Sequence, residues 1–421
     1  MVFKAMRRIY TFFLYLLLPF IVCRLYWKGR HLPAYRKRIL ERFSIGTQVT
    51  EADVWLHAVS LGEVVAATPL IDMLLAHDVR VLVTTMTPTG SQQVLTRFSN
   101  KVQHCYLPYD YPWVLRRFFK KIKVRLGVIM ETELWPNLIE YAHRLSLPLV
   151  LANARISDDA YRQYHKVRFL FKPIVSKFSA ILAQSELDAE RFMALGAPKS
   201  LVSVAGNMKF DIQTTISQAS WFESLKEAWG AQRTVLIAAS THDDEERQLL
   251  TRLSSLQQRI PDVVLLIAPR HPERFEAVFA LSQQLGFRTC QRSQHALIDV
   301  SAEVIILDSM GELTGFYHVS DYAFVGGSLV PIGGHNVLEP IALGVPTFCG
   351  PHMQNSKAIC KALCDANALQ LVNDADALMA ALIATYGDND GRMRQISNAT
   401  KVLVANQGSV RRHWETINGF F

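Results

Sequence analysis

The sequence lacks both of the short glycine motifs by which nucleotide-binding proteins most often hold phosphate groups. No G-x-x-x-x-G-K-[ST] occurs in its 421 residues, and no G-x-G-x-x-G follows the first strand expected in either half. It also has no low-complexity segment or short-period repeat, and half of its residues are hydrophobic while 19% are charged. These features argue against an ATPase, a dehydrogenase, a coiled coil and a disordered chain.

Cysteine is scarce, and its spacing excludes a zinc motif. The chain has six cysteines and no C-x-x-C pair. Cys360 and Cys364 stand four apart, which makes them neighbours on a helix, but no cluster of His or Cys completes a metal site. We therefore expect reduced, structural cysteines in a cytosolic compartment and no bound metal.

Long apolar runs are also few, and the one near the N-terminus is short for a membrane span. The run from Ile9 to Cys23 contains 15 residues and includes Pro19, whereas a spanning helix needs about 20. No small-x-small cleavage site follows it, so a signal peptide is not favoured. Residues 24–38 are basic and aromatic, which favours a cytoplasmic headgroup layer.

Positive charge is confined largely to this arm. The formal net charge is +8, and residues 1–50 alone carry +9, which leaves −1 for the other 371 residues. We predict that residues 1–45 form an uncleaved, shallow anchor on an anionic membrane surface. A buried N-terminal helix is the alternative, and a nucleic-acid-binding arm is not expected because the apolar stretch would have no purpose there.

Beyond the arm, short apolar runs alternate with longer amphipathic segments. Buried parallel strands are predicted at 54–59, 79–85, 126–130, 147–153, 179–185, 201–205, 234–240, 263–269, 304–308, 321–327 and 345–350. Helices are predicted at 62–76, 89–98, 110–121, 135–145, 243–258 and 272–286. This alternation is typical of an α/β protein with parallel sheets covered on both faces.

A polar stretch without a strand-like run divides the pattern into two. We expect an N-terminal Rossmann-like domain at 46–212, a linker at 213–230 and a C-terminal Rossmann-like domain at 231–421. Ligands of doubly wound sheets bind beyond the carboxyl ends of the strands, so a cleft between the domains is the expected site.

Acidic side chains follow two predicted strands of the N-terminal half. Glu63, after strand 54–59, is a candidate general base, although a helix first-turn Glu that only complements the helix dipole is equally compatible. Glu131 and Glu133 follow strand 126–130, and their spacing aims both the same way on an extended backbone. Lys209 can supply positive charge beside them, but a surface lysine is the simpler interpretation.

The C-terminal half places anion and hydroxyl partners after several strands. Any one glycine pair can be an ordinary turn, but several such loops in one domain indicate a nucleotide-binding half, because glycines let the backbone approach an anion. Arg270 offers a bidentate fork for a phosphate, and Glu339 can hold ribose hydroxyls. The loop residues are Ser240, His242, Arg270, His271, Gly311, Glu312, Gly326, Gly327, Ser328, Gly333, Gly334, His335, Asn336 and Glu339.

The motifs in this order resemble the 3-deoxy-D-manno-octulosonic acid (Kdo) transferases of lipopolysaccharide biosynthesis, which have the GT-B fold. The resemblance runs from residue 34 to about residue 410. Its motifs are HAVSLGE, TTMTPTG, METELWPN, LANARIS, GNMKFD, STHDDEE, PRHPERF, DSMGEL, FVGGSL and GGHNVLEP. Leu61 stands where Val is frequent in the first motif, which changes no polar group.

The resemblance implies an inverting transfer of Kdo from CMP-Kdo to the lipid A precursor lipid IVA, without a metal or other cofactor, at the cytoplasmic face of the inner membrane. It implies that Glu63 is the general base and that Glu131 and Lys209 stabilise the transition state. It assigns CMP binding to Pro269, Arg270, Met310, Gly311, Glu312, Asn336, Val337, Leu338 and Glu339. From the strand-end loops themselves, we expect support of the donor site by Ser240, His242, His271, Gly333, Gly334 and His335.

Two alternatives stay open at this point. One is another membrane-associated GT-B enzyme with a different nucleotide-sugar donor. The other is a membrane-docked binding protein that retains the fold without turnover, against which the carboxylates at positions 63 and 131 argue.

Overall fold

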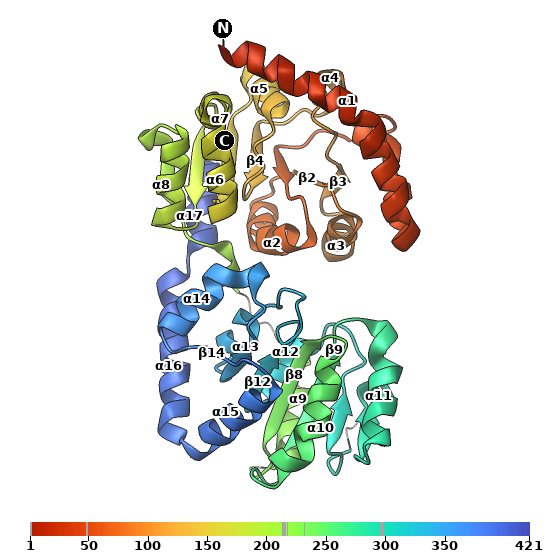
Figure 1. Ribbon diagram of the computed structural model, residues 1–421. Coiled ribbons are helices and arrows are strands. Elements are labelled where there is room, and N and C mark those ends of the chain that lie inside the picture. The colour runs from red at the N-terminus through yellow and green to blue at the C-terminus, as the bar shows by residue number, and fades with distance from the viewer. Residues whose placement is uncertain (1, 48, 213–215, 217, 231, 295–298) are drawn as a thin grey trace. The chain divides into compact units, whose positions relative to one another are not determined.

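The computed structural model (Figure 1) describes residues 2–47, 49–212, 216, 218–230, 232–294 and 299–421. The chain forms two compact units. Unit 1 contains residues 1–211 together with 406–421, and unit 2 contains residues 212–405. The chain therefore passes between the units twice.

Unit 1 is built on one parallel sheet, which has seven strands in the described part of the chain, in the order β3-β2-β1-β4-β5-β6-β7. Alternate residues of a strand point to opposite faces, so Trp55 joins one apolar cluster while Val54 and Leu56 join the other. The strands are β1 (Val54–His57), β2 (Val81–Thr85), β3 (Gln103–Tyr106), β4 (Leu126–Met130), β5 (Leu149–Ala154), β6 (Ala180–Ala183) and β7 (Val202–Val204).

Helices cover both faces of this sheet, as its near-continuous apolar strands require. They are α1 (Val2–His31), α2 (Leu61–Ala76), α3 (Pro88–Phe98), α4 (Pro112–Lys121), α5 (Pro136–Arg144), α6 (Asp158–Lys166), α7 (Arg168–Val175), α8 (Glu186–Leu195) and α17 (Ser409–Asn418). Short 3-10 turns lie at η1 (Pro33–Arg36), η2 (Ile39–Phe43), η3 (Lys199–Leu201) and η4 (Met208–Phe210).

Unit 2 repeats the architecture, again with one parallel sheet of seven described strands, in the order β10-β11-β9-β8-β12-β13-β14. The strands are β8 (Val235–Thr241), β9 (Val264–Pro269), β10 (Thr289–Gln291), β11 (Val304–Ile306), β12 (Tyr322–Val325), β13 (Thr347–Cys349) and β14 (Gln370–Leu371). The helices are α9 (Ala219–Trp229), α10 (Glu245–Gln257), α11 (Phe275–Gln284), α12 (Leu313–His318), α13 (Leu338–Ala342), α14 (Lys357–Asp365), α15 (Ala375–Gly387) and α16 (Asn389–Asn406).

In the described part of the chain, each sheet has a central position where the strand order reverses direction, and in unit 2 the edge strands β10 and β11 are also out of chain order. In unit 1 the central position lies between β1 and β4, and in unit 2 between β8 and β12. At such a point the connecting helices diverge to opposite faces and leave a crevice beyond the carboxyl ends of the strands. The segments that follow these four strands are therefore the loops in which to look for a site.

The predicted strands and helices are confirmed, with shifts of a few residues at their ends. Three strands, β3, β10 and β14, were not predicted. They lie at sheet edges, and β3 (QHCY) and β14 (QL) carry polar or exposed residues in place of an apolar run. An edge strand is covered less completely, so its sequence shows a weaker hydrophobic signal.

Two predicted boundaries are wrong. Much of the expected linker at 213–230 is helix α9, whose Phe222, Leu225 and Trp229 are buried in the core of unit 2; residues 213–215 and 217 lie outside the described residues. The end of the expected C-terminal domain, residues 406–421, belongs to unit 1. There α17, drawn in blue, packs against α2 and η4 (Figure 1).

The N-terminal arm forms helix α1, which extends beyond the apolar run at both ends. Residues Phe3–Arg30 are long and apolar enough to cross a membrane, and this helix lies near the N-terminus. Its first half contacts the body of unit 1: Arg7 and Thr11 hydrogen-bond Asn137, and the Tyr111 hydroxyl donates to the Leu14 carbonyl over 2.8 Å. The large apolar side chains Phe12, Leu16 and Phe20 are exposed, a pattern that is compatible with membrane anchoring.

Candidate active site

Glu63 lies in the first turn of α2, directly after strand β1. Ser60 caps this helix, and its hydroxyl donates to Glu63 Oε1 over 2.9 Å. The other oxygen, Oε2, accepts the backbone N–H of Val59 over 2.8 Å. This S-x-x-E arrangement is a variant of the capping box, in which Glu63 accepts the N–H of the residue before the N-cap and the hydroxyl of the N-cap, and it fixes the carboxylate at the carboxyl end of the strand.

The TTMTPTG segment supports this loop from the neighbouring strand end. The backbone N–H groups of Met86 and Thr87 both donate to the Val59 carbonyl, over 3.0 and 3.2 Å. A Cβ on Gly90 would lie 3.2 Å from the carbonyl carbon of Ser60, so a larger residue there would press on the loop. The glycine of this motif thus lets α3 approach the Glu63 loop closely.

Burial raises the pKa of Glu63 to about 7, and the negative charges of Glu131 and Glu133 add to the rise. The hydrogen bonds from Val59 and Ser60 oppose it. A carboxylate with a pKa near neutrality can both accept and release a proton at cellular pH, which is the property of a general base.

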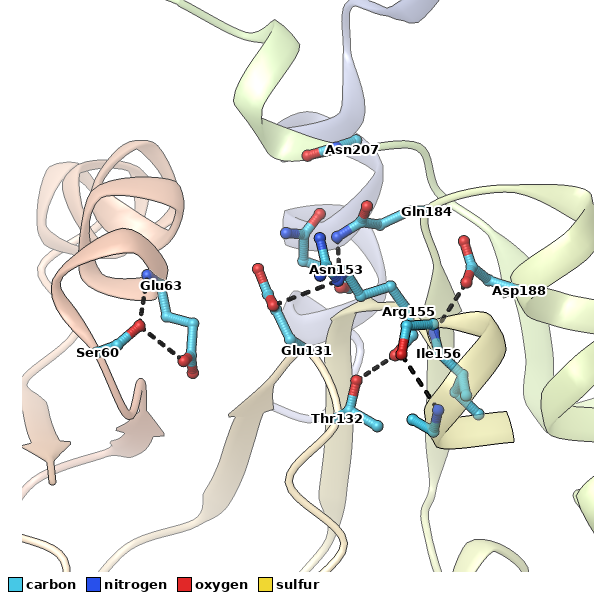
Figure 2. A network of polar contacts seen from close by, with 12 residues as sticks. Ser60, Glu63, Glu131, Thr132, Asn153, Arg155, Ile156, Gln184, Asp188 and Asn207 are labelled. Carbon is cyan, nitrogen blue, oxygen red and sulfur yellow. Dashed lines mark hydrogen bonds and ion pairs between the residues drawn. The ribbon is translucent and has the colours of Figure 1, made fainter. Parts of the chain in front are cut away.

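Glu131 follows β4, on the other side of the switch point of unit 1, and has a positive φ of 55°. Figure 2 shows it between Glu63 and Arg155. The Arg155 Nε lies 3.6 Å from its Oε2. Glu133 does not share this partner, because its carboxylate accepts the Trp135 indole N–H over 2.6 Å. The two glutamates of METELWPN therefore have different partners.

Lys209 lies in η4, which packs against α2. Its backbone N–H donates to Asn207 Oδ1 over 3.0 Å, and its side chain is half-buried. Within the described residues the ion pair to Glu131 comes from Arg155, and Lys209 forms none. Lys209 therefore belongs to the neighbourhood of α2, while the cation that contacts Glu131 is one that the sequence analysis did not single out.

In unit 2 the loop after β12 wraps around a carboxylate of the protein itself. Glu245, in the first turn of α10, is 0% exposed. Its Oε2 accepts the N–H groups of His242 and Gly327 over 2.9 and 2.7 Å, and its Oε1 accepts those of Ser328 and Leu329 over 3.0 and 2.9 Å. The N–H of Gly327, expected to face a nucleotide anion, thus donates to Glu245, while the N–H of Gly326 donates to the Ala239 carbonyl over 2.8 Å.

Three histidines gather at the switch point of unit 2. The Nε2 atoms of His242 and His335 lie 2.8 Å apart with their rings stacked, and the His271 ring lies edge-on to His242. Burial lowers the pKa of His335 to about 4, helped by the positive charges of its neighbours, including Arg270. Burial likewise lowers the pKa of His242. The pair is therefore neutral at pH 7, and one ring donates to the other.

The residues before this cluster follow β8 and β9. Ser240 has a positive φ of 55° at a bulge where the pairing of β8 and β9 shifts. Pro269 ends β9, and the Arg270 N–H donates to the Thr241 carbonyl over 2.9 Å. In the described part of the chain the Arg270 guanidinium forms no ion pair, so it is available to an anionic ligand.

The remaining predicted donor residues form two further groups in unit 2. Asn336 donates to Glu339 Oε1 over 3.0 Å and accepts the Leu338 N–H, which links the loop to the first turn of α13, while Val337 is buried. The Glu312 carboxylate accepts a hydrogen bond from the Arg292 guanidinium over 3.0 Å. It follows the exposed Met310 and Gly311, which has a positive φ of 86°.

Gly333 and Gly334 serve the packing of this loop. A Cβ on either residue would collide with Asn355 or Met353, at 2.6 and 2.1 Å. Among the described residues, no group of three or more His, Cys, Asp or Glu side chains is arranged to hold a metal ion. All six cysteines are free.

Sequence reasoning missed Arg155 and Glu245. A usable signal existed for each, since Arg155 lies in the LANARIS segment directly after β5, and Glu245 follows β8 as Glu63 follows β1. The sequence could not show that four backbone N–H groups surround the carboxylate of Glu245, whereas the carboxylate of Glu63 accepts one.

Comparison with known proteins places these features in one family. A family model described as 3-deoxy-D-manno-octulosonic-acid transferase (kdotransferase) matches residues 37–212. The chain is 38% identical to a 3-deoxy-D-manno-octulosonic acid transferase of Haemophilus influenzae, covering 96% of both chains, and 32% identical to one of Bordetella pertussis, covering 86% of both.

Solved structures agree on the fold. A structure of the glycotransferase of kitacinnamycin is 13% identical, covers 89% of this chain and all of its own, and has a TM-score of 0.58. The two Rossmann-like units are thus of the GT-B class. The chain belongs to the 3-deoxy-D-manno-octulosonic acid transferases, glycosyltransferases that transfer Kdo in lipopolysaccharide biosynthesis.

Proposed function

We propose that this glycosyltransferase transfers Kdo from CMP-Kdo to lipid IVA with inversion at the anomeric carbon, and that Glu63 is the general base. The observation that carries the proposal is Glu63 itself, fixed by Ser60 and Val59 at the switch point of unit 1, with burial raising its pKa to about 7. A base of this strength is half-ionised near neutral pH, where a sugar hydroxyl needs a proton acceptor.

In the proposed step, Glu63 takes the proton of the acceptor's sugar hydroxyl as its oxygen attacks the anomeric carbon of Kdo. The new C–O bond forms on the face opposite to the leaving group, and the bond between Kdo and the CMP phosphate breaks. CMP departs with that electron pair. Glu131, held by Arg155, and Lys209 stabilise the transition state.

Unit 2 would hold the donor beyond β8, β9 and β12. The Arg270 guanidinium is suited to the phosphate because it can donate two parallel hydrogen bonds. Pro269, Met310, Gly311, Glu312 and the stretch Asn336–Glu339 surround the nucleotide in this proposal, with the neutral His242 and His335 pair beside it. We expect no metal requirement, so transfer should persist in EDTA.

The proposed acceptor is a phosphorylated glycolipid of an anionic membrane. Helix α1 would hold the enzyme at the membrane surface from which this acceptor enters the site. Exposed apolar side chains of α1 and the cations of residues 1–50 fit the cytoplasmic face of the inner membrane, where each surface cation contributes about 1 kcal/mol.

Mass spectrometry of lipid IVA, after incubation with CMP-Kdo and the detergent-solubilised protein, tests the reaction and counts the Kdo units added. We expect product with the wild type and a rate lower by about 10²–10⁴-fold with Glu63→Gln, because the amide cannot take the proton. No product from the wild type, in a mixture where another Kdo transferase is active, would overturn the donor or acceptor assignment.

Glu186→Gln is the matched control. Glu186 also stands behind a Ser cap, in the first turn of a helix that follows a parallel strand of unit 1, but it is exposed. Its substitution should leave the rate within about twofold, as for most surface changes. Equal losses in both variants would remove Glu63 from the role of base.

The melting temperature of the protein with different nucleotides tests the identity of the donor separately. CMP should raise the melting temperature of the protein and UDP should not, since binding to the folded state alone stabilises it. Protection by UDP with none by CMP would favour the alternative of a GT-B enzyme with another nucleotide-sugar donor. Binding of CMP without any product would favour a binding protein.

A further inference from the structure

Strand β5 has an irregularity near its end, where the backbone N–H of Asn153 bonds to a side chain and not to a neighbouring strand. Its pairing with β6 shifts between Leu151 and Ala154. Asn153 lies in this interval, is 0% exposed and has a positive φ of 51°. Such a left-handed conformation is uncommon for residues other than glycine, although Asn tolerates it better than most. The conformation must therefore be held by its surroundings.

The polar groups of Asn153 connect three separate segments of unit 1. Its N–H donates to His413 Nε2 over 2.9 Å. Its side-chain Oδ1 accepts the N–H of Met208 over 3.1 Å. Its backbone carbonyl accepts a hydrogen bond from Gln184 Nε2 over 3.0 Å, which Figure 2 shows. Asn153 is thus bonded at once to α17, to η4 and to the end of β6.

Two residues of the candidate active site adjoin these bonds. Lys209 follows Met208 directly, in η4. Arg155, two residues beyond Asn153, contacts Glu131, and its carbonyl accepts the hydroxyl of Thr132. A shift of Asn153 would therefore move both the Arg155–Glu131 pair and the turn that carries Lys209.

His413 is oriented so that it can serve as an acceptor. It is 0% exposed on α17, and its Nδ1 lies 2.7 Å from the Ser409 carbonyl. Because that carbonyl can only accept, Nδ1 carries the proton and Nε2 is left to accept from Asn153. Without this acceptor, the N–H of Asn153 would be buried and unpaired.

Helix α17 is itself secured to the same part of the chain. At the first turn of α17, the N–H groups of Gly408 and Val410 donate to the Asp211 carboxylate over 2.7 and 2.6 Å. Arg412 Nε donates to the Ala205 carbonyl over 2.8 Å. The ring of His413 is therefore presented to Asn153 from a helix with a fixed position.

We propose that His413 is a positioning residue for Kdo transfer: from the C-terminal helix it holds Asn153, and through Asn153 it sets the Arg155–Glu131 pair and the Lys209 turn. This rests on the proposed function of Glu131 and Lys209. It predicts that loss of the Nε2 acceptor slows the chemical step without weakening nucleotide binding by unit 2.

The test compares His413→Leu, His413→Gln and His413→Asn in the full-length protein. Gln places an amide oxygen near the position of Nε2, whereas Asn reaches only to that of Nδ1. We expect Leu and Asn to lower kcat by about tenfold or more, because small misplacements of catalytic groups cost that much, and Gln to restore most of it. CMP affinity should change less than about twofold in all three variants.

Trp414→Ala is the control for lost stability. Trp414 is the next residue of α17, and its ring contacts the ring of His77, at the C-terminal end of α2, with the centroids 4.3 Å apart and the planes tilted by 32°. Glu63 stands 14 residues earlier in that helix, which is on the order of 20 Å away. This variant should lower the melting temperature and leave kcat within about twofold.

The outcomes are distinct. The proposal is wrong if, across all variants including Trp414→Ala, kcat falls with the melting temperature. It is also wrong if His413→Gln and His413→Asn have the same kcat. In either case His413 has only a structural role. If Leu does not yield folded protein, the comparison of Gln with Asn decides alone. Absence of product with the wild type would instead contradict the proposed function, and it is recognised before any variant is compared.

Discussion

Each unit carries a glutamate in the first helical turn after its central strand, and the two carboxylates are in opposite situations. Glu63, after β1, accepts one backbone N–H and one hydroxyl, and burial raises its pKa to about 7. Glu245, after β8, is fully buried and accepts N–H groups from His242, Gly327, Ser328 and Leu329.

The difference lies in how many donors surround the negative charge. A carboxylate such as that of Glu245, whose two oxygens accept four backbone N–H groups, has neither oxygen free for a substrate proton. One that is desolvated with few donors binds a proton more readily. The same residue type at the corresponding place in the fold thus anchors backbone loops in unit 2 and is a candidate base in unit 1.

Among substitutions of the two glutamates, we expect Glu245→Gln to have the largest effect on stability. The amide keeps one acceptor oxygen, but its NH₂ group would face two backbone N–H donors. We expect the free energy of unfolding of unit 2 to fall by about 3 kcal/mol or more, since each lost bond involves a charged acceptor. CMP affinity should fall because the loops carrying His242 and Gly327 lose their common partner. Chemical denaturation and CMP titration measure both, and unchanged values would show that Glu245 is dispensable.

Glu63→Gln should have the opposite effect on stability. The pKa of Glu63 is raised in the folded state, so wild-type stability from this group is fully present below its ordinary pKa and is lost as pH rises through about 7. The melting temperature of the variant should therefore match the wild type near pH 4.5, exceed it increasingly up to about pH 7, and differ by a constant amount above that. A constant difference from pH 4.5 to about 7 would contradict the raised pKa.

The smallest effect concerns the pH dependence of the rate. The rate should rise with pH with a midpoint near 7, as Glu63 loses its proton. Glu131→Gln should move this midpoint to lower pH, because the charge of Glu131 helps to raise the pKa of Glu63, and Glu133→Gln should move it less. Profiles of kcat/KM, each normalised to its own plateau, measure the shift. A larger shift from Glu133→Gln would place the two carboxylates differently from the geometry described above.

Sequence reasoning predicted the two-unit α/β fold because buried parallel strands are nearly continuous apolar runs, as in LGVIM and VVLLIAP. It also found both strand-end loops of unit 1, since Glu63 and Glu131 directly follow such runs. It placed residues 406–421 in the wrong unit, because a return of the chain depends on tertiary contacts such as the bond between Asn153 and His413, 260 residues apart. It could not show that the N–H of Gly327 in the FVGGSL loop donates to Glu245, because a glycine loop can bind an anion of the protein as well as one of a ligand.

The bonds of Asp211 have a consequence for how this protein can be divided. Asp211 is the last residue before the chain leaves unit 1, and it holds Gly408, just after the chain has returned. The exit and the re-entry are thus neighbours, and unit 2 is an insertion within a single host domain. A short flexible loop in place of residues 212–405 would close unit 1 at little entropic cost. Unit 2 is in this sense a removable module, open to exchange between relatives or to circular permutation without cutting either sheet.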